Sequence, residues 1–180
     1  MIYKLNTSNL DKLREFKQLF AKYGHDLATT QIDLREIDAD LLSVIIHKAS
    51  QMPEGVLVED TTLEIDGASI GVKIKWLLDH LPNYVGHKAA WVVLLAYHDK
   101  ENVYVYKGEV LGSIVKTSSH AKNGFGFDPV FLPEYTNATL AESKPDEVNA
   151  RAFAVEAFIH DRPFMVKPIM NEWQGPWQEE

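Results

Sequence analysis

Two adjacent carboxylates follow a short apolar segment in the first third of the chain. The stretch GVLVEDTTL, residues 55 to 63, runs from Val56–Val58 directly into Glu59 and Asp60. A Val- and Leu-rich segment is typical of a strand buried on both faces, and ligands gather beyond the carboxyl ends of such strands in α/β proteins. Paired carboxylates at that position can hold a divalent cation or activate a water. The alternative is a strand that simply ends in solvent, and this stretch alone leaves both open.

A second candidate site lies between the first predicted strand and the first predicted helix. In NTSNLDK, Thr7, Ser8 and Asn9 stand where a helix N-terminus exposes unpaired N–H groups, and Lys12 falls in the opening turn. This arrangement suits a phosphate. The alternative is an ordinary helix cap at Ser8 or Asn9 followed by a solvated surface lysine. As a phosphate ligand, Lys12 is expected to be exposed, so that its removal barely changes stability.

The third candidate is NGFGFDPVF, residues 123 to 131. Its two glycines permit close backbone approaches, its aromatic residues can stack on a base, and Asp128 is expected to be extended because Pro129 follows it. The loop could bind a purine, or it could be a turn whose aromatics cover the core. The sequence contains no P-loop, no Rossmann glycine fingerprint and no H-E-x-x-H zinc helix.

Composition narrows the classes of protein. A chain of 180 residues with 46% hydrophobic content predicts a single domain over residues 1–180. The absence of cysteine excludes disulfides, zinc–thiolate sites and thiol nucleophiles. A net charge of -8 disfavours non-specific binding to nucleic acid or an anionic membrane, so an anionic substrate would need a local basic pocket or metal ions. With no membrane-length apolar run and no signal-peptide pattern at the N-terminus, a cytoplasmic protein is expected.

Hydrophobic periodicity predicts the elements that must position these residues. Helices and strands alternate, which is typical of an α/β fold. The predicted strands are 2–5, 27–32, 56–58, 89–99 and 102–116, the last two as an antiparallel pair, and the predicted helices are 10–23, 39–50, 72–81 and 145–158. The tail from residue 162, with three prolines and two tryptophans, is predicted to be irregular.

Seven segments together resemble one enzyme family. TSNLDKLREF, IDLREID, VIIHKAS, VLVEDTTL, IKWLLDHL, GFGFDPVF and ATLAES occur in the order and approximate spacing of the inosine triphosphate pyrophosphatase family, from Thr7 to about Phe158. Members split the purine nucleoside triphosphates ITP, dITP and XTP into monophosphate and pyrophosphate with magnesium. The resemblance implies an elongated, two-lobed α/β fold with a long curved mixed β-sheet, flanking helices and a nucleotide cleft between the lobes. It also implies a homodimer.

The resemblance assigns roles to individual residues. Glu36 and Asp60 correspond to metal ligands, and Asp60, with Glu59 beside it, corresponds to the catalytic carboxylate. Those assigned to the phosphate side of the substrate are Thr7, Ser8, Asn9, Lys12, Lys48 and Lys75, those assigned to the base are Phe125, Gly126, Phe127, Asp128, Lys144 and Arg151, and Thr61 is assigned to the substrate as a whole.

One segment departs from the family pattern. The family has a lysine followed by Ser-His-Arg at the start of a helix, whereas this chain reads AESKPDEVNARAFA. Asn149 and Ala150 stand where Ser and His are expected, and Arg151 alone stays in register. Without the histidine, base preference is expected to be relaxed, unless Asn149 substitutes as a reader.

Two other functions remain open from the sequence. One is a related nucleotide pyrophosphatase with a different base preference, including the Maf-like enzymes. The other is a non-catalytic nucleotide-binding protein. A non-catalytic protein has less need of a complete metal site. The presence of all the acids and lysines of the family pattern therefore argues against it; they are Glu36, Glu59, Asp60, Lys12, Lys48 and Lys75.

Overall fold

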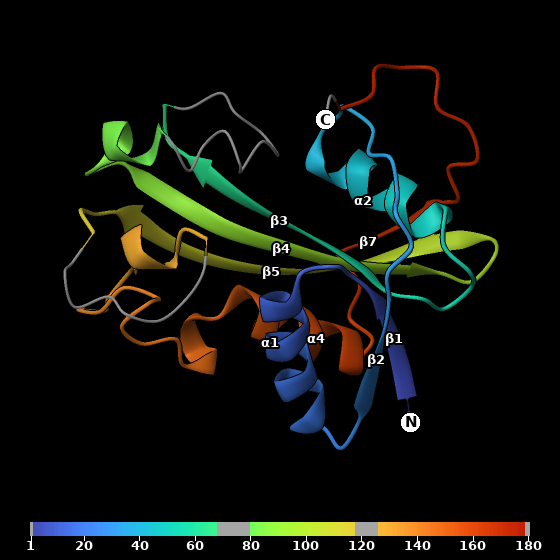
Figure 1. Cartoon of the computed structure of the whole chain (residues 1–180), viewed down its shortest axis with the longest axis horizontal. Helices are drawn as coiled ribbons and strands as arrows, with labels where there is room; N and C mark the ends of the chain where they lie inside the picture. The colour runs from blue at the N-terminus through green and yellow to red at the C-terminus, as the bar shows by residue number, and fades with distance from the viewer. Residues whose placement is uncertain (1, 68–79, 118–125, 179–180) are drawn as a thin grey trace. The chain divides into compact units, whose positions relative to one another are not determined.

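The computed structural model describes residues 2–67, 80–117 and 126–178 (Figure 1). The chain divides into two compact units, in keeping with the two lobes expected. Unit 1 contains Met1–Asp60, Val93–Gly108 and Arg151–Glu180, and unit 2 contains Thr61–Val92 and Glu109–Ala150. No helix among the described residues is both long and apolar enough to span a membrane.

The observed elements confirm the predicted alternation of strands and helices. The strands are β1 (Ile2–Asn6), β2 (Asp26–Thr30), β3 (Val58–Ile65), β4 (Lys88–His98), β5 (Asn102–Ile114), β6 (Phe131–Pro133) and β7 (Met165–Pro168). The α-helices are α1 (Leu10–Ala21), α2 (Leu41–Ser50) and α4 (Ala150–Ile159), and short 3-10 helices occupy Leu81–Tyr84, Asp128–Val130 and Asp146–Val148.

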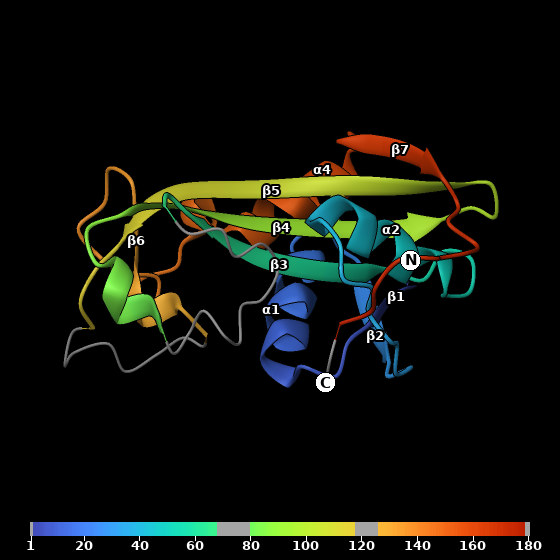
Figure 2. The same cartoon turned by 90° about the horizontal axis from the view of Figure 1, so that it is seen from above.

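The strands form a mixed arrangement. β1 and β2 are parallel, in register from Ile2↔Asp26 to Asn6↔Thr30, with α1 as their crossover. The larger sheet has the order β3-β4-β5-β6, and β7 pairs with β5, along whose edge it lies in Figure 2. β4 and β5 are neighbours joined by three residues, a connection that only antiparallel strands permit, so the predicted pair is confirmed.

β1 also runs beside the residue that leads into β3. Leu5 and Leu57 form a parallel bridge, the N–H of Leu57 donates to the carbonyl of Lys4, and the N–H of Asn6 donates to the carbonyl of Leu57, both at 2.8 Å. Because parallel neighbours carry their carboxyl ends in the same direction, the loop after β1 and the acids of β3 lie at the same end of unit 1. This pairing brings the first two candidate sites together.

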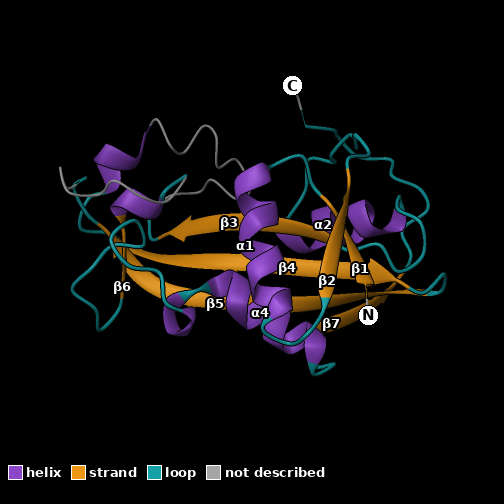
Figure 3. Ribbon diagram, turned by 60° about the horizontal axis from the view of Figure 1, so that its bottom comes forward, coloured by secondary structure: helices purple, strands orange, loops and turns teal. Residues whose placement is uncertain are grey.

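Helices α1 and α4 pack on each other in unit 1 (Figure 3). The ring of Phe20 in α1 lies 5.9 Å from that of Phe158 in α4, and Tyr3 of β1 lies 5.5 Å from the first and 5.2 Å from the second. The buried residues of α1 recur at helical spacing, so its apolar stripe faces this aromatic cluster. Helix α2 covers the other face of the strands in unit 1, as Figure 1 shows.

Helix α2 begins two residues later than the predicted helix because Asp40 caps it. The Asp40 carboxylate accepts hydrogen bonds from the N–H of Ser43 at 3.1 Å and from its hydroxyl at 2.6 Å. The hydroxyl bond from Ser43, together with the backbone N–H bonds, lowers the pKa of Asp40 below its usual 3.8.

We expect Asp40→Ala to lower the free energy of unfolding by about 1 kcal/mol at neutral pH, because the first turn of α2 loses its acceptor. Asp40→Ser, which keeps a capping oxygen, should lose only a fraction of that. Since the folded-state pKa of Asp40 is depressed, the stabilisation is complete above about pH 3.8 and is lost as the pH falls through the folded-state pKa. Urea unfolding at pH 7 and pH 3 measures both differences, and an equal cost at the two pH values would contradict the cap.

The predicted boundaries are wrong in two places near the C-terminus. The helix predicted over residues 145–158 is a 3-10 turn followed by α4, because Asn149 between them is extended, with φ -110° and ψ 108°. The tail predicted to be irregular contains β7, and Trp177 forms a further bridge to Ile37. Apolar alternation in MVKP is too short to be recognised without its partner strand. Most of the helix predicted over 72–81 lies outside the described residues.

Unit 2 has an aromatic core of its own. Trp91, Phe127 and Phe131 are buried, with ring centroids 5.9 Å apart for both Trp91–Phe127 and Phe127–Phe131. β6 pairs antiparallel with the end of β5, and Gly112 leaves the space that the Phe131 ring fills, since a Cβ at Gly112 would lie 2.7 Å from that ring.

Candidate active site

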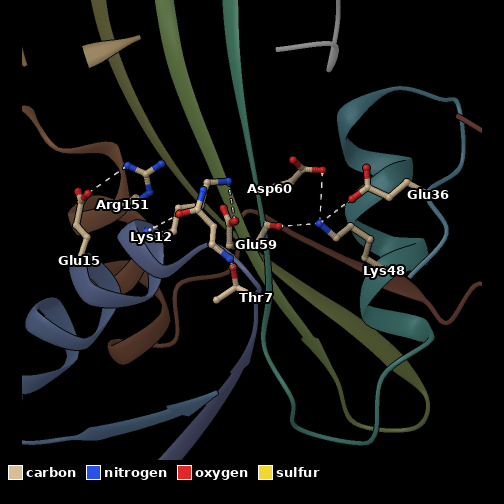
Figure 4. Close-up of polar contacts among 9 residues, drawn as sticks. Thr7, Lys12, Glu15, Glu36, Lys48, Glu59, Asp60 and Arg151 are labelled. Atoms are coloured by element: carbon tan, nitrogen blue, oxygen red, sulfur yellow. Dashed lines mark hydrogen bonds and ion pairs between the residues drawn. The ribbon is translucent and has the colours of Figure 1, made fainter. Parts of the chain in front are cut away.

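The two adjacent acids lie inside β3 and point to opposite faces. We expected the strand to end at Val58, but β3 runs from Val58 to Ile65 and contains both. Successive side chains of a strand alternate between faces, so Glu59 points toward Lys12 of α1 while Asp60 points toward Lys48 of α2 (Figure 4). The strand continues through two charged residues because each has a cationic partner. Thr61, assigned to the substrate, is buried in the same strand.

On the α1 face, Lys12 and Glu59 form a close ion pair. Lys12 Nζ lies 2.8 Å from Glu59 Oε1, and the side chains are 21% and 6% exposed. Burial alone would raise the pKa of Glu59, but Lys12, Lys48 and Arg151 outweigh it and hold that pKa below its usual value. The expectation of an exposed, solvated Lys12 is therefore wrong. A lysine held by a buried carboxylate is a preset positive charge at the start of α1.

On the α2 face, two carboxylates converge on one ammonium group. Lys48 Nζ lies 3.1 Å from Glu36 Oε1 and 3.9 Å from Asp60 Oδ2, and it donates to the Glu59 carbonyl at 3.0 Å. Burial opposes the charge on Lys48, but Asp60, Glu36 and Glu59 together raise its pKa. Burial, with the neighbouring carboxylates of Glu59 and Glu36, raises the pKa of Asp60 to about 6 despite Lys48. Negative charge on this face exceeds what Lys48 neutralises.

The α2 face suits an oxygen-liganded cation. Glu36 and Asp60 already share one cation, the Lys48 ammonium. Burial is the main cause of the raised pKa of Asp60 and the carboxylates of Glu59 and Glu36 add to it, so a divalent ion would stabilise the ionised form of this buried carboxylate. Within residues 2–67, 80–117 and 126–178, no group of three or more His, Cys, Asp and Glu side chains is arranged to hold a metal. Magnesium usually retains several waters and needs one or two carboxylates, so this pair meets its requirement.

The loop after β1 is partly engaged in capping α1. Asn9 Oδ1 accepts a hydrogen bond from the N–H of Lys12, and Thr7 Oγ1 accepts one from the N–H of Asn9, both at 3.1 Å. The cap that we weighed against a phosphate site is thus present, while Ser8 is exposed. The cap and a phosphate site are compatible, because capping by Asn9 leaves other first-turn N–H groups available to an anion.

In unit 2 the residues assigned to the base form a second buried ion pair. Lys144 Nζ lies 2.6 Å from Asp128 Oδ2, and the two side chains are 15% and 3% exposed. The Lys144 ammonium also lies 5.6 Å from the centroid of the Trp91 ring. Asp128 is the first residue of a 3-10 helix, so our expectation of an extended conformation is wrong. A proline early in a helical turn is tolerated because its missing N–H would have no partner there.

Of the other residues assigned to the base in this loop, the structure describes Gly126 and Phe127. Gly126 has φ +61°, which favours glycine, and Phe127 is buried in the aromatic core of unit 2. Phe125 lies outside the described residues, as does Lys75 of the phosphate set. Stacking of a base on these aromatics stays a prediction.

Residues 149–151, where the segment departs most from the family pattern, are buried. Ala150 is fully buried, Asn149 is nearly so, and Arg151 Nη1 lies 3.4 Å from Glu15 Oε2 of α1. The family-like Arg151 is therefore held by an acid. Sequence analysis did not select Glu15. It lies three residues after Lys12, on the same face of α1, and this spacing could have identified it as a residue near the site.

Sequence reasoning also missed Trp91 and Trp177. Trp91 lies in the apolar strand β4, and this pattern accounts for its burial. Nothing in the pattern indicates that its ring lies beside Lys144. Trp177 stands in the tail predicted to be irregular, and its bridge to Ile37 joins residues too far apart in the chain for a local pattern to predict.

These elements define an α/β protein that presents two carboxylates and two lysines on the faces of one buried strand. The chain matches the Ham1 family model over residues 4–161, and it belongs to that family. This membership confirms the resemblance drawn from its motifs.

Named relatives and solved structures agree with this assignment. The inosine triphosphate pyrophosphatase of Yarrowia lipolytica is 30% identical over 182 residues, covering 89% of this chain and 94% of the relative. The dITP/XTP pyrophosphatase of Methanopyrus kandleri is 28% identical over 172 residues, covering 84% and 91%. A HAM1 protein structure from Coxiella burnetii matches with a TM-score of 0.69 at 22% identity, covering 89% of this chain and 98% of that one, which confirms the ITPase-like fold.

Proposed function

We propose that this protein is a nucleoside triphosphate pyrophosphatase that splits ITP, dITP and XTP into monophosphate and pyrophosphate, with magnesium. The observation that carries the proposal is the convergence of Glu36 and Asp60 on one cation. The names of its relatives support the reaction and the substrate class. We also propose, from the composition and the family resemblance, that residues 1–180 form a single domain and that the protein is a cytoplasmic homodimer that binds neither nucleic acid nor membrane.

The residues on the α2 face of β3 are assigned the metal and the chemical step. Glu36 and Asp60 would hold the metal, which when bound neutralises phosphate charge and polarises the phosphorus. Asp60 orients a water and accepts its proton as general base. The water oxygen bonds to the α-phosphorus, the bond from that phosphorus to the bridging oxygen breaks, and pyrophosphate leaves.

The lysines supply the positive charge that an acidic protein needs to bind a triphosphate. Lys12 and Lys48 are both held by carboxylates, so their charges are in place before the substrate arrives. Glu59 is buried against Lys12, so we assign it the task of holding that lysine and give Asp60 the role of base. The N-terminus of α1, with Thr7, Ser8 and Asn9, completes the phosphate side.

Pyrophosphate release from a panel of nucleotides tests the proposal. ITP, dITP, XTP, GTP and ATP are each incubated with the protein, with magnesium or with EDTA, and pyrophosphate and monophosphate are measured. We expect equal amounts of the two products from ITP and XTP with magnesium and almost none with EDTA. Nucleotide binding without turnover would favour the non-catalytic alternative, and release of inorganic phosphate in place of pyrophosphate would contradict the reaction.

A relaxed base preference is favoured by the buried segment around Ala150. Alanine presents no hydrogen-bonding side chain, and Arg151 is engaged by Glu15. With one reader missing, discrimination between ITP and GTP or ATP is expected to fall by about 1–3 kcal/mol, roughly 5- to 150-fold in specificity constant. The same panel measures these constants. Strong selectivity for ITP and XTP would show that the base is read by other residues.

A further inference from the structure

The C-terminal tail returns to the segment that carries Glu36. Residues 162–180 lie beyond the part of the chain that the family model matches. Trp177 and Ile37 nevertheless form an antiparallel bridge within unit 1, and Ile37 is fully buried. Figure 1 shows the red tail passing around α2 and ending beside the chain that enters this helix.

Three hydrogen bonds from the tail hold the backbone around Glu36. The N–H of Gln178 donates to the Glu36 carbonyl at 2.9 Å, and its side-chain Nε2 donates to the Ile37 carbonyl at 3.1 Å. The N–H of Asp38 donates to the Pro176 carbonyl at 3.0 Å. Residues 31–36 have no regular secondary structure, so neither a helix nor a strand fixes the direction of the Glu36 side chain.

The Trp177 ring contacts the two residues that directly precede the partners of the Glu36–Lys48 ion pair. On one side, Arg35 Cζ lies 4.5 Å from the ring centroid, and Arg35 directly precedes Glu36. On the other, the His47 ring lies 5.4 Å away, edge to face, and His47 directly precedes Lys48 in α2. One tryptophan therefore sets the spacing between the segment of Glu36 and the helix of Lys48.

We infer that Trp177 and Gln178 are positioning residues, which hold Glu36 toward Lys48 and Asp60 and so complete the cation site of this chain. The inference rests on the proposed function, because it takes Glu36 as a metal ligand. A ligand on an irregular segment must be ordered when the metal binds, and a tail that orders it beforehand removes that cost. Partners that orient metal ligands typically contribute 10- to 100-fold in metal affinity.

The test is Mn²⁺ affinity of the full-length, nucleotide-free protein, read from the electron paramagnetic resonance signal of free Mn²⁺. Trp177→Ala is expected to weaken Mn²⁺ binding by about tenfold, within the range for such partners. Gln174→Ala, an exposed position of the same tail, is the matched control and should bind as the wild type does. Gln178→Ala removes one side-chain hydrogen bond and is expected to weaken binding by about threefold, with little risk to folding.

A double-mutant cycle shows whether the tail acts through Glu36. Glu36→Gln should weaken Mn²⁺ binding by itself, and adding Trp177→Ala should then weaken it no further, because the residue being positioned is gone. Additive losses would overturn the inference. So would wild-type affinity in Trp177→Ala and Gln178→Ala with only a lower unfolding midpoint, which is the mark of a purely structural tail.

The inference and the proposed function fail in different ways. If Glu36→Gln weakens Mn²⁺ binding but the tail variants do not, the metal site stands and the positioning role is wrong. If the wild type does not bind Mn²⁺, or if Glu36→Gln binds it normally, both the assigned site and the positioning role are wrong. Pyrophosphate release from ITP, measured separately, then decides whether the reaction itself survives.

Discussion

Replacing Asp60 with asparagine should reduce pyrophosphate release by about 10²- to 10⁴-fold, the usual loss when a general base is removed. The amide cannot accept the proton of the attacking water, and it removes one of the two negative charges that would hold the metal. The measurement is the turnover number for ITP at saturating substrate and magnesium. Near-normal turnover would show that Asp60 is neither the base nor a needed ligand.

The same variant should fold at least as well as the wild type in the absence of metal. Burial raises the pKa of Asp60 to about 6, so its charge at neutral pH opposes folding. Removing that charge is expected to leave the unfolding midpoint unchanged or raised. Glu64→Gln is the matched control, because it neutralises an exposed carboxylate of the same strand and should change neither turnover nor stability.

Replacing Lys12 with methionine should lower the free energy of unfolding by about 3 kcal/mol, because it strips the close partner from a buried carboxylate. Glu59 is 6% exposed and its carboxylate lies 2.8 Å from Lys12. Methionine keeps the length of the side chain, so the loss reports the charge and not the packing. Urea unfolding at pH 7 measures the change, and the Michaelis constant for ITP should rise as well.

Two controls separate this pair from the general effect of losing a lysine. Lys17→Met removes an exposed lysine from the same helix and should change stability by less than about 0.5 kcal/mol. Adding Glu59→Gln to Lys12→Met removes the buried carboxylate charge that has lost its close lysine, and it should recover most of the lost stability without restoring triphosphate binding. A Lys12→Met protein as stable as Lys17→Met would mean that Lys48 and Arg151 alone compensate the buried Glu59 carboxylate and that the pair with Lys12 adds nothing to folding.

Local pattern alone determined the elements of this protein and the types of its functional residues. The spacing of Leu13, Phe16, Leu19 and Phe20 predicts α1, and the apolar runs predict β4 and β5 as a hairpin. The residue types predict a cap at Ser8 or Asn9, and they mark the acids, the lysines and the glycine–aromatic loop as groups that can bind or react. These properties are local, since they depend on residues a few positions apart.

Tertiary structure decided how these residues are paired, because each pair joins segments far apart in the chain. Glu59 and Asp60 are neighbours in sequence, yet the pleat of β3 turns one toward Lys12 and the other toward Lys48. Which helix covers which face of β3 is set by the packing of α1 and α2, and no pattern within VLVEDTTL records it. The tail shows the same limit, since Gln178 binds the backbone of Ile37, 141 residues earlier, through contacts that exist only after both segments have folded.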